Sequence, residues 1–449
     1  MSNNKTIPEL GIMQMITNYQ HINENLIYYF NHILEEHDGL VKMKLPYSLI
    51  LTNHSEFVNH VFRKNNKNYI ISKLVRETFR EEVAAGLPTI AGKPWLKQRR
   101  AMQPGFHKKK LEGTVNLMIE EANLYIETVL DKYAENQQEV DLFSEMLMLT
   151  FRLIIKILFG KTFNEEKMLL FRESIEFGLQ TFINKTRKPY LKPWYRINGL
   201  HAKNKQLQKT RDKYVSDFIQ KRRDSGKQED DLLDMLLNVQ YEDGSSMTNK
   251  QLLEEVILLF VAGHETSGNG VAWILFILDK YPEIAQKMID YIDEHLGDRT
   301  PTLEDLSNMS YITQVIEEGL RLYPPAWYIE REALGDDNIE GVSITKGQTI
   351  AISIYSLHRN PKYWENPDKF DPDRFSPENK KKREASTYMP FGIGPRLCIG
   401  KNIALMEMQL ILILTLRRYK INFLTKETTF KAVLNLAPKE KVMVKLERR

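Results

Sequence analysis

Apolar residues recur at three- and four-residue spacings over long stretches of the chain, which predicts that most of it is helical. The clearest such stretches cover residues 120–135, 142–160 and 251–283. Shorter runs at 42–53, 347–356 and 439–449 combine β-branched residues with alternating polarity, so they predict strands. The predicted fold class is therefore mainly α with small β-sheets.

The same patterns predict a single domain over residues 1–449. Length alone would suggest about three domains. However, the chain contains no internal repeat or low-complexity block. The charged stretch near residue 225 has helical patterns on both sides, so we expect a surface loop there and not a linker.

Composition limits the partners and the compartment. The net charge is +4, from 63 basic and 59 acidic residues, which does not call for a nucleic-acid partner. One cysteine cannot form an internal disulfide, which favours a reducing compartment. The first 26 residues are polar, without an apolar run suited to a signal peptide or anchor. We therefore expect a cytoplasmic protein without a membrane anchor.

The single cysteine lies in the stretch "PFGIGPRLCIGKN", residues 390–402, just before an apolar helical pattern. This position is the positive end of a helix dipole and favours the thiolate, which is the metal-binding form. Nearby glycines would let backbone N–H groups point at the sulfur and leave room for a flat cofactor. A buried inert cysteine is the alternative. The pattern F-x-x-G-x-R-x-C-x-G argues against it, through Phe391, Gly394, Arg396, Cys398 and Gly400.

This stretch resembles the haem-binding loop of the cytochrome P450 family, and the likeness covers nearly the whole chain. The resemblance implies one large helical domain, with haem b between a long central helix and the helix after the cysteine loop. It also implies that Cys398 is the axial iron ligand. Arg396 would then pair with a haem propionate, and Phe391 would shield the sulfur.

A second motif, "AGHETS", supports the resemblance through Ala262, Gly263, Glu265 and Thr266. The Thr266 hydroxyl can bond back to the carbonyl of Ala262 and open the helix locally, which would make a groove for dioxygen. The resemblance implies that Glu265 and Thr266 are the acid and alcohol that help deliver protons to dioxygen. On its own, a Glu-Thr pair is more often an ordinary part of a helix surface.

Three further motifs follow the order of the family. Glu318 and Arg321 fall on one helical face, and the resemblance implies that Arg374 joins them in an ion network that holds the cysteine loop. Isolated pairs of this kind are worth little at a surface. The family also implies three more contacts of haem propionates, at Trp95, Arg99 and Arg331.

The implied reaction is the insertion of one oxygen atom of O2 into a substrate C–H bond. Electrons would come from NAD(P)H through a separate reductase and a ferredoxin or flavodoxin, because the last strand is followed by no further segment. Basic groups could steer such an acidic partner, although an ordinary solvated surface explains them as well. They are Lys97, Arg100, Lys108, Lys109, Lys110 and residues 380–383.

The substrate is less defined. The sequence resembles a branch that contains fatty-acid hydroxylases, which need an apolar channel and a cation or hydroxyl for the carboxylate. No residue of the sequence can be assigned as that carboxylate anchor. Trp327 and Tyr328 are predicted pocket residues that could stack on a sugar, although Trp327 could equally pack a loop. O-demethylation of a methylated sugar or aromatic ether, releasing formaldehyde, is therefore an alternative function.

Two other classes remain at this stage. One is a peroxide-driven peroxygenase or a haem-thiolate isomerase, and the other is a non-catalytic haem sensor. Relatives of the first class commonly alter the acid-alcohol pair or the cysteine loop, and a sensor needs neither Glu265 nor Thr266. Both motifs are intact here, so the monooxygenase is favoured.

Overall fold

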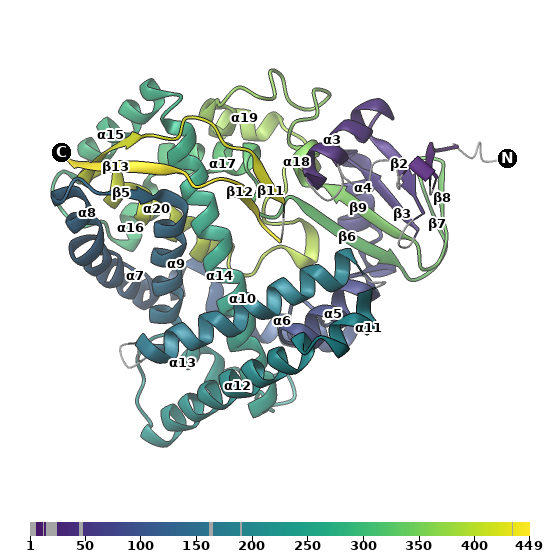
Figure 1. Cartoon of the computed structure of the whole chain (residues 1–449), viewed down its shortest axis with the longest axis horizontal. Helices are drawn as coiled ribbons and strands as arrows, with labels where there is room; N and C mark the ends of the chain where they lie inside the picture. The colour runs from purple at the N-terminus through teal and green to yellow at the C-terminus, as the bar shows by residue number, and fades with distance from the viewer. Residues whose placement is uncertain are drawn as a thin grey trace.

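A computed structural model of the chain describes residues 6–11, 13–14, 25–44, 48–160, 165–188, 191–432 and 434–449. Helices form most of it, with the larger sheet at one end (Figure 1). The longer helices are α3 (Leu26–Glu36), α5 (Lys73–Glu82), α6 (Gly92–Met102), α7 (Glu112–Tyr125), α9 (Leu142–Phe159), α10 (Glu165–Arg187), α12 (Leu200–Ser225), α14 (Asn249–Leu278), α15 (Pro282–Leu296), α17 (Ser310–Leu322) and α20 (Lys401–Arg418). Shorter helical pieces connect them, among them α4 (Ser55–Asn59), η1 (His60–Lys64), η4 (Lys108–Lys110), η5 (Ile126–Leu130), α8 (Asp131–Glu135), α11 (Lys192–Ile197), α13 (Leu232–Leu237), α16 (Leu303–Asn308), α18 (Ile354–Leu357) and α19 (Pro377–Lys382).

The largest sheet has six strands in the order β1-β2-β3-β9-β6-β4. Its strands are β1 (Glu9–Leu10), β2 (Leu40–Met43), β3 (Leu49–Thr52), β9 (Thr349–Ser353), β6 (Tyr328–Ala333) and β4 (Tyr69–Ile70). Strand β3 runs parallel to β9, and β6 runs antiparallel to β9 with Arg331 opposite Ile350. This register joins the N-terminal part of the chain to the segment that carries Tyr328 and Arg331.

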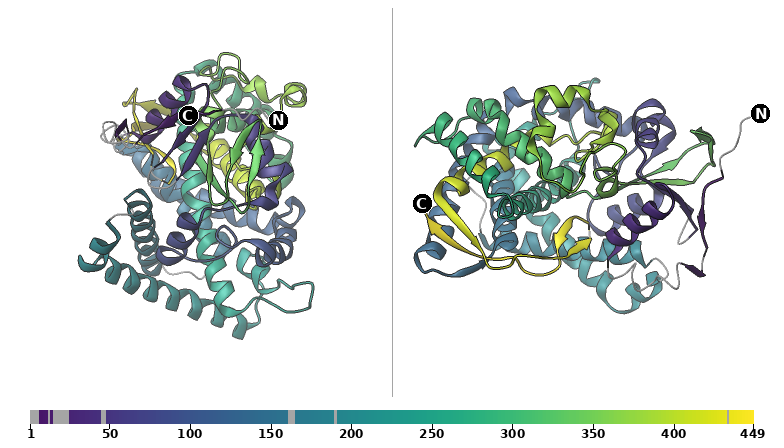
Figure 2. Two further views of the ribbon diagram at one scale, coloured as in Figure 1. Left: turned by 90° about the vertical axis from the view of Figure 1, so that its right-hand side faces the viewer. Right: turned by 90° about the horizontal axis from the view of Figure 1, so that it is seen from above.

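Three smaller sheets complete the structure. One has the order β10-β13-β5, with β10 (Tyr419–Phe423), β13 (Met443–Arg448) and β5 (Glu139–Asp141). The other two are hairpins, β7 (Asp337–Ile339) with β8 (Val342–Ile344) and β11 (Phe430–Ala432) with β12 (Leu436–Pro438). The view from above shows the N-terminal strands of the six-stranded sheet at one end of the molecule and β10 with β13 at the other, near the C-terminus (Figure 2).

Helix α14 runs through the middle of the molecule (Figure 1). Thr248 and Gln251 start it with a capping box, which satisfies two N–H groups of the first turn. Two glycines let α9 approach it closely. A Cβ on Gly263 would lie 2.6 Å from the Cδ1 of Ile154, and one on Gly268 would lie 2.7 Å from the Oγ1 of Thr150.

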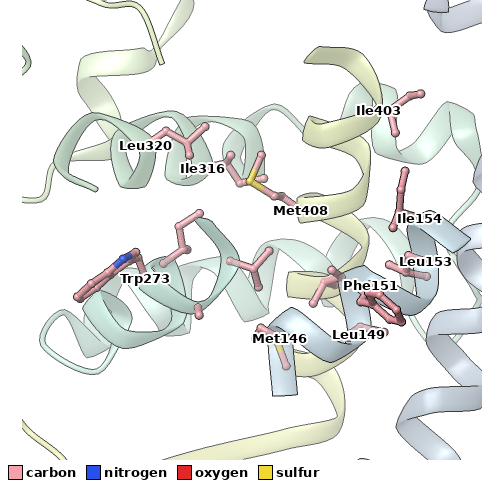
Figure 3. Close-up of a cluster of buried hydrophobic side chains, with 14 of the residues drawn as sticks. Met146, Leu149, Phe151, Leu153, Ile154, Trp273, Ile316, Leu320, Ile403 and Met408 are labelled. Atoms are coloured by element: carbon pink, nitrogen blue, oxygen red, sulfur yellow. The ribbon is translucent and has the colours of Figure 1, made fainter. Parts of the chain in front are cut away.

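The core joins α14 to α9, α17 and α20. Figure 3 shows Met408 of α20 pointing toward Ile316 and Leu320 of α17, with Ile154 of α9 on another side. Trp273 of α14 is 1% exposed, and its indole stacks on Tyr323 with ring centroids 4.5 Å apart. The helix that carries Glu265 and Thr266 is thereby held against the helix that follows Cys398.

The elements predicted from the sequence are largely present. Residues 120–135 form one continuous helical run, made of α7, η5 and α8, and residues 142–160 contain α9. The stretch 42–53 contains the end of β2 and the whole of β3, while residues 45–47 lie outside the described residues. The predicted helix 251–283 ends at Leu278, because Pro282 starts α15 instead.

Candidate functional site

A cavity of about 1170 Å³ lies against α14 and is lined mostly by apolar side chains. It exceeds the roughly 300–1,000 Å³ of ordinary small-molecule pockets. Its lining includes Cys398 from the cysteine loop and Thr266 from α14, so the two main motifs face one space. The residues predicted to contact a cofactor also line it, namely Trp95, Arg99, Ala262, Gly263, Arg331, Phe391 and Arg396.

The cysteine loop is shaped by glycines and closed by a backbone hydrogen bond. The N–H of Cys398 donates to the carbonyl of Phe391 at 2.9 Å. Gly392 and Gly394 have φ of +73° and +74°, a region that favours glycine. A Cβ on Gly394 would collide with the carbonyl oxygen of Phe62. The loop therefore requires glycine at this position for both its conformation and its contact.

The environment of Cys398 differs in one respect from the expectation. Burial raises the pKa of the thiol, and this outweighs the backbone N–H groups of Gly400 and Lys401 and the positive charges of Arg99 and Lys401, which lower it. Cys398 retains accessible surface, which belongs to the cavity wall and not to the outside. The helix position alone thus does not make a thiolate. A bound metal ion deprotonates a coordinating thiol outright.

Three arginines crowd the same cavity. Burial and the charge of Arg396 lower the pKa of Arg331 to about 9, and burial with the charge of Arg99 lowers the pKa of Arg396 to about 10. The pKa of Arg99 is also lowered, chiefly by burial. Like charges close together and out of water are costly unless an anion joins them. This wall therefore suits the two propionates of haem b.

The aromatic residues expected near the cofactor take part in the same wall. The guanidinium of Arg396 lies 4.3 Å from the ring centroid of Trp95 and donates to the carbonyl of Ile90 at 2.9 Å. Phe391 is half-buried, and its carbonyl accepts the hydrogen bond from the N–H of Cys398. One thiol for the iron, three guanidinium groups for the propionates and flat apolar surfaces for the ring together fit haem b.

On α14, the Thr266 hydroxyl donates to the Ala262 carbonyl at 2.8 Å, as expected. The expected local opening of the helix is not present, since α14 is helical without interruption from Asn249 to Leu278. A threonine hydroxyl can share the carbonyl four residues earlier without breaking the helix. The space beside Gly263 is occupied by Ile154 of α9. The glycine thus serves the packing of α9 as well as the cavity wall.

The side chain of Glu265 points to a different place than that of its neighbour Thr266. It does not belong to the cavity lining. Its carboxyl hydrogen-bonds to Asn435 at the tip of the β11–β12 hairpin, and burial raises its pKa while this bond opposes the rise. The structure therefore brings Thr266 toward Cys398, and turns the predicted acid toward the hairpin.

A different carboxyl group lines the cavity. Glu407 of α20 is 3% exposed, and burial raises its pKa to about 8, opposed by a hydrogen bond from Ser267. Ser267 is the neighbour of Thr266 and lines the cavity with Glu407. Glu407 was not among the residues predicted from the sequence. A charged residue inside the apolar run "IALMEMQLILIL" was the available signal, because a buried carboxyl is rarely kept without a use.

The three residues predicted to form an ion network are in contact. Arg321 donates to both carboxylate oxygens of Glu318, at 2.7 and 2.8 Å, and both side chains have no exposed surface. The Nε of Arg374 lies 3.5 Å from Oε1 of Glu318. Arg321 also donates to the carbonyls of His358, Pro367 and Lys369, at 2.8, 2.6 and 3.0 Å. Glu318 is thus the centre of a buried network in which Arg321 is held by hydrogen bonds and Arg374 adds an ion pair.

His358, which no sequence motif predicted, connects this network to the segment just before the cysteine loop. Its Nδ1 lies 3.2 Å from the carbonyl of Arg321, and its Nε2 accepts from the N–H of Met389 at 2.9 Å. Burial and the charge of Arg321 hold the pKa of this imidazole well below its usual range. A neutral ring with a proton on Nδ1 satisfies both bonds. No spacing in the sequence relates His358 to Met389.

Trp327 and Tyr328 both line the cavity, and both are also held by protein contacts. Trp327 is 4% exposed and packs on Phe30 with ring centroids 6.0 Å apart. The hydroxyl of Tyr328 donates to Oε2 of Glu330 at 2.6 Å. Trp327 therefore offers little surface on which a ring could stack.

Comparisons with known proteins agree with this geometry. The model of the cytochrome P450 family matches residues 3–445. Human cytochrome P450 4Z1 is 30% identical over 417 residues, which cover 87% of this chain and 81% of the relative. Putative cytochrome P450 132 of Mycobacterium tuberculosis is 29% identical over 412 residues, covering 87% and 86%. The crystal structure of the cytochrome P450DA heme domain superimposes with a TM-score of 0.89 at 24% identity, covering 99% of this chain and 97% of that one.

The chain belongs to the cytochrome P450 family. It is accordingly a monooxygenase of the oxidoreductase class, with haem b held by a cysteine thiolate, O2 as co-substrate and NAD(P)H acting through a reductase. Haem supplies dioxygen activation when it is bound. Cys398 would hold its iron, and Arg99, Arg331 and Arg396 would hold its propionates. Within the described ranges, no helix is long and apolar enough to cross a membrane.

Proposed function

We propose that the protein hydroxylates a long apolar molecule, such as a fatty acid, by inserting one oxygen atom of O2 into a C–H bond. The observation that carries this proposal is the cavity itself, whose apolar lining continues from Cys398 to α3, α5 and α10. Leu26 of α3, Val75 and Phe79 of α5 and Phe182 of α10 belong to that lining. Burying a hydrocarbon chain against such side chains contributes about 0.8 kcal/mol for each methylene group.

In this proposal the chain positions the substrate and moves protons. Monooxygenation consumes two electrons and two protons for each O2 and releases one water. Thr266 presents a hydroxyl to the cavity, and Glu407 presents a carboxyl next to Ser267. The apolar lining excludes other water from the reacting carbon, which limits unproductive reduction of dioxygen.

We propose that electrons arrive from a separate acidic partner such as a ferredoxin or flavodoxin. Lys108, Lys109 and Lys110 are exposed, and the amide of Asn402, at the start of α20, donates to the nearby carbonyl of Phe106 at 3.2 Å. A basic patch beside the cysteine loop would raise the association rate of such a partner. Other basic groups are less available, since Lys97 pairs with Asp243 at 2.7 Å and Arg100 with Glu242 at 3.1 Å.

O-demethylation of a methylated sugar is not favoured by any observation on Trp327 or Tyr328. Trp327 is buried against Phe30, and the hydroxyl of Tyr328 is engaged by Glu330. A sugar would also need several polar groups in the wall, whereas the lining is mostly apolar.

A spectral titration of the purified ferric protein tests the proposal. Two ligand sets are compared, long-chain fatty acids and small methyl ethers that include O-methylated sugars. Displacement of water from the iron by a fitting substrate shifts the Soret band. We expect a shift with the fatty acids and none with the ethers. The opposite result would support demethylation, and Cys398→Ala serves as the control without thiolate ligation.

A further inference from the structure

A buried carboxyl of α14 joins three parts of the cavity wall. Glu255 is 1% exposed and belongs to the cavity lining. Its Oε1 atom accepts a hydrogen bond from the N–H of Leu87 at 2.6 Å and another from the side-chain amide of Gln98 of α6. Glu255 therefore connects α14 with α6 and with the segment that precedes α6.

Both partners of this oxygen are uncharged N–H groups, so the contact is a pair of hydrogen bonds and not an ion pair. Burial raises the pKa of Glu255 to about 8, against the effect of the hydrogen bonds from Leu87 and Gln98. A glutamate is rarely buried without partners, and these two donors supply them. An ordinary buried carboxyl would only hold neighbouring elements together. Here one of the elements forms part of the cavity wall.

The segment that Glu255 holds is a closed turn, residues 86–90. The N–H groups of Thr89 and Ile90 donate to the carbonyl of Gly86 at 2.8 and 2.9 Å, and the N–H of Gly86 donates to the hydroxyl of Thr89 at 3.1 Å. Leu87, Pro88 and Thr89 line the cavity. Because the turn is closed by its own hydrogen bonds, we expect it to move as one unit.

Two contacts hold the turn from different sides. Glu255 holds it at Leu87, and the guanidinium of Arg396 donates to the carbonyl of Ile90 at 2.9 Å. The turn thus bridges α14 and the cysteine loop. Arg396 belongs to the group of arginines that suits the haem propionates, whereas Glu255 lies about three turns of α14 before Thr266. The hold at Leu87 can therefore be altered without changing the residues assigned to the cofactor.

The turn fits tightly against α14 at Gly86. The φ of Gly86 is +146°, and a Cβ there would lie 2.5 Å from Oε1 of Glu255 and 2.6 Å from Cδ1 of Leu258. Such a Cβ would have to displace either the turn or these two side chains. Either movement disturbs the contact between Glu255 and Leu87. Gly86 and Glu255 consequently control the distance between the turn and α14 from two sides.

We propose that Glu255 is a positioning residue that sets the width of the cavity by holding the turn 86–90 against α14. This deepens the proposed function, on which it rests for the identity of the substrate, and specifies the shapes that the site accepts. Leu87 of the turn and Leu258 and Leu259 of α14 belong to the same lining. With these walls close together, an unbranched chain makes contacts on several sides. A broad, rigid ring system has to displace the turn.

The test uses two ligands that bind the haem iron through the same group. 1-Dodecylimidazole and clotrimazole both coordinate iron through an imidazole nitrogen, but the first carries an unbranched chain and the second three aromatic rings. Dissociation constants are taken from the Soret shift of the haem-loaded wild type and variants. Glu255→Leu leaves the N–H of Leu87 and the amide of Gln98 without their acceptor. We expect it to shift the ratio of the two constants in favour of clotrimazole by roughly tenfold.

Two further variants distinguish positioning from a general loss of structure. Glu255→Gln keeps an oxygen acceptor and should preserve the wild-type ratio. Gly86→Ala keeps the carboxyl but disturbs its contact with the turn, so the ratio should change in the same direction as in Glu255→Leu. Glu254→Gln is the matched control, because it removes the neighbouring carboxyl, which lies outside the cavity lining. It should bind both ligands like the wild type.

An equal change of both constants in Glu255→Leu would overturn the inference, as would a wild-type ratio in Gly86→Ala or an altered ratio in Glu255→Gln. If Glu255→Leu does not retain haem, the other two variants decide. An imidazole nitrogen binds the iron whatever the natural substrate is, so these results do not depend on fatty acids. A wild-type protein that binds both imidazoles but gives no Soret shift with fatty acids would contradict the proposed function and leave the role of Glu255 standing.

Discussion

The side chain of Asn435 hydrogen-bonds to the carboxyl of Glu265 and holds it away from the cavity that Thr266 lines. The hairpin that carries Asn435 is fixed next to its tip, because the indole of Trp273 donates to the carbonyl of Leu436 at 3.0 Å. Its tip also places Leu434 in the cavity lining. The tip of the hairpin therefore connects a residue of the cavity lining, Leu434, with the predicted acid, Glu265.

This relationship predicts different results for two variants. Glu265→Gln should retain haem and lose coupling, because a primary amide cannot give up a proton as a carboxylic acid does. Asn435→Leu removes the hydrogen bond that opposes the effect of burial, so the pKa of Glu265 should rise and the pH optimum of coupled turnover should move upward. Product formed per NAD(P)H consumed, measured against pH, checks both. Full coupling in Glu265→Gln would show that Glu407 and Ser267 suffice.

For Thr266 we expect Thr266→Ala to bind haem normally and to divert electrons into peroxide, because the hydroxyl beside the Ala262 carbonyl is lost. Product per NAD(P)H should fall several-fold. Thr266→Ser keeps the hydroxyl and should stay close to the wild type. Peroxide and product are measured together with a surrogate reductase. Unchanged coupling in the alanine variant would exclude Thr266 from proton delivery.

The buried network predicts a large loss of stability. Glu318→Ala leaves the guanidinium of Arg321 buried without its carboxylate and should cost about 3–5 kcal/mol. The exposed pair of Lys445 and Glu139, with a distance of 3.5 Å, provides the comparison. Glu139→Ala should change the free energy of unfolding by less than about 1 kcal/mol. Denaturant unfolding measures both, and similar small losses would mean that the network is not needed for stability.

His358 predicts a pH dependence of stability with a defined sign. Its pKa is lowered in the folded state, so below about pH 6.5 the unfolded chain binds a proton that the folded protein does not. The contribution of His358 to the free energy of unfolding should therefore be complete above that pH. As the pH drops below it, the free energy of unfolding should fall by up to about 1.4 kcal/mol per pH unit because of this residue.

His358→Gln preserves a donor and an acceptor without a titrating ring. Unfolding at several pH values between 7.5 and 5 should give a shallower slope for this variant than for the wild type. The difference between the two slopes isolates His358, since all other groups are shared. Identical slopes would mean that the imidazole takes up its proton over the same pH range in the folded and the unfolded protein.

Much of this site follows from local patterns in the sequence. The helical spacing located α9 and α14, the position of Cys398 before a helix was correct, and Glu318 and Arg321 meet because residues three apart share a helical face. Glu407 and His358 were missed, since their roles depend on contacts between elements distant in the sequence. The orientation of Glu265 could not be predicted from the helical spacing either, because its partner Asn435 lies on a hairpin far along the chain.

Gly394 offers a test of the cysteine loop. In Gly394→Ala the new Cβ would meet the carbonyl of Phe62, on top of the strain at positive φ. We expect the variant to lose thiolate-ligated haem. Gly226 also has positive φ, but its surroundings are open, so Gly226→Ala should cost only about 1–2 kcal/mol and keep haem. Haem content and the absorption spectrum distinguish these results.

The contact between Gly394 and Phe62 also joins two parts of the chain that are distant in the sequence. The cysteine loop comes late in the chain, yet its outer boundary is a backbone carbonyl of η1, near the beginning. We therefore expect the loop to take its final shape only when the segment containing η1 has docked. Incorporation of haem should accordingly depend on a contact between the first and last parts of the chain. A truncated N-terminal region should leave Cys398 present but without its cofactor.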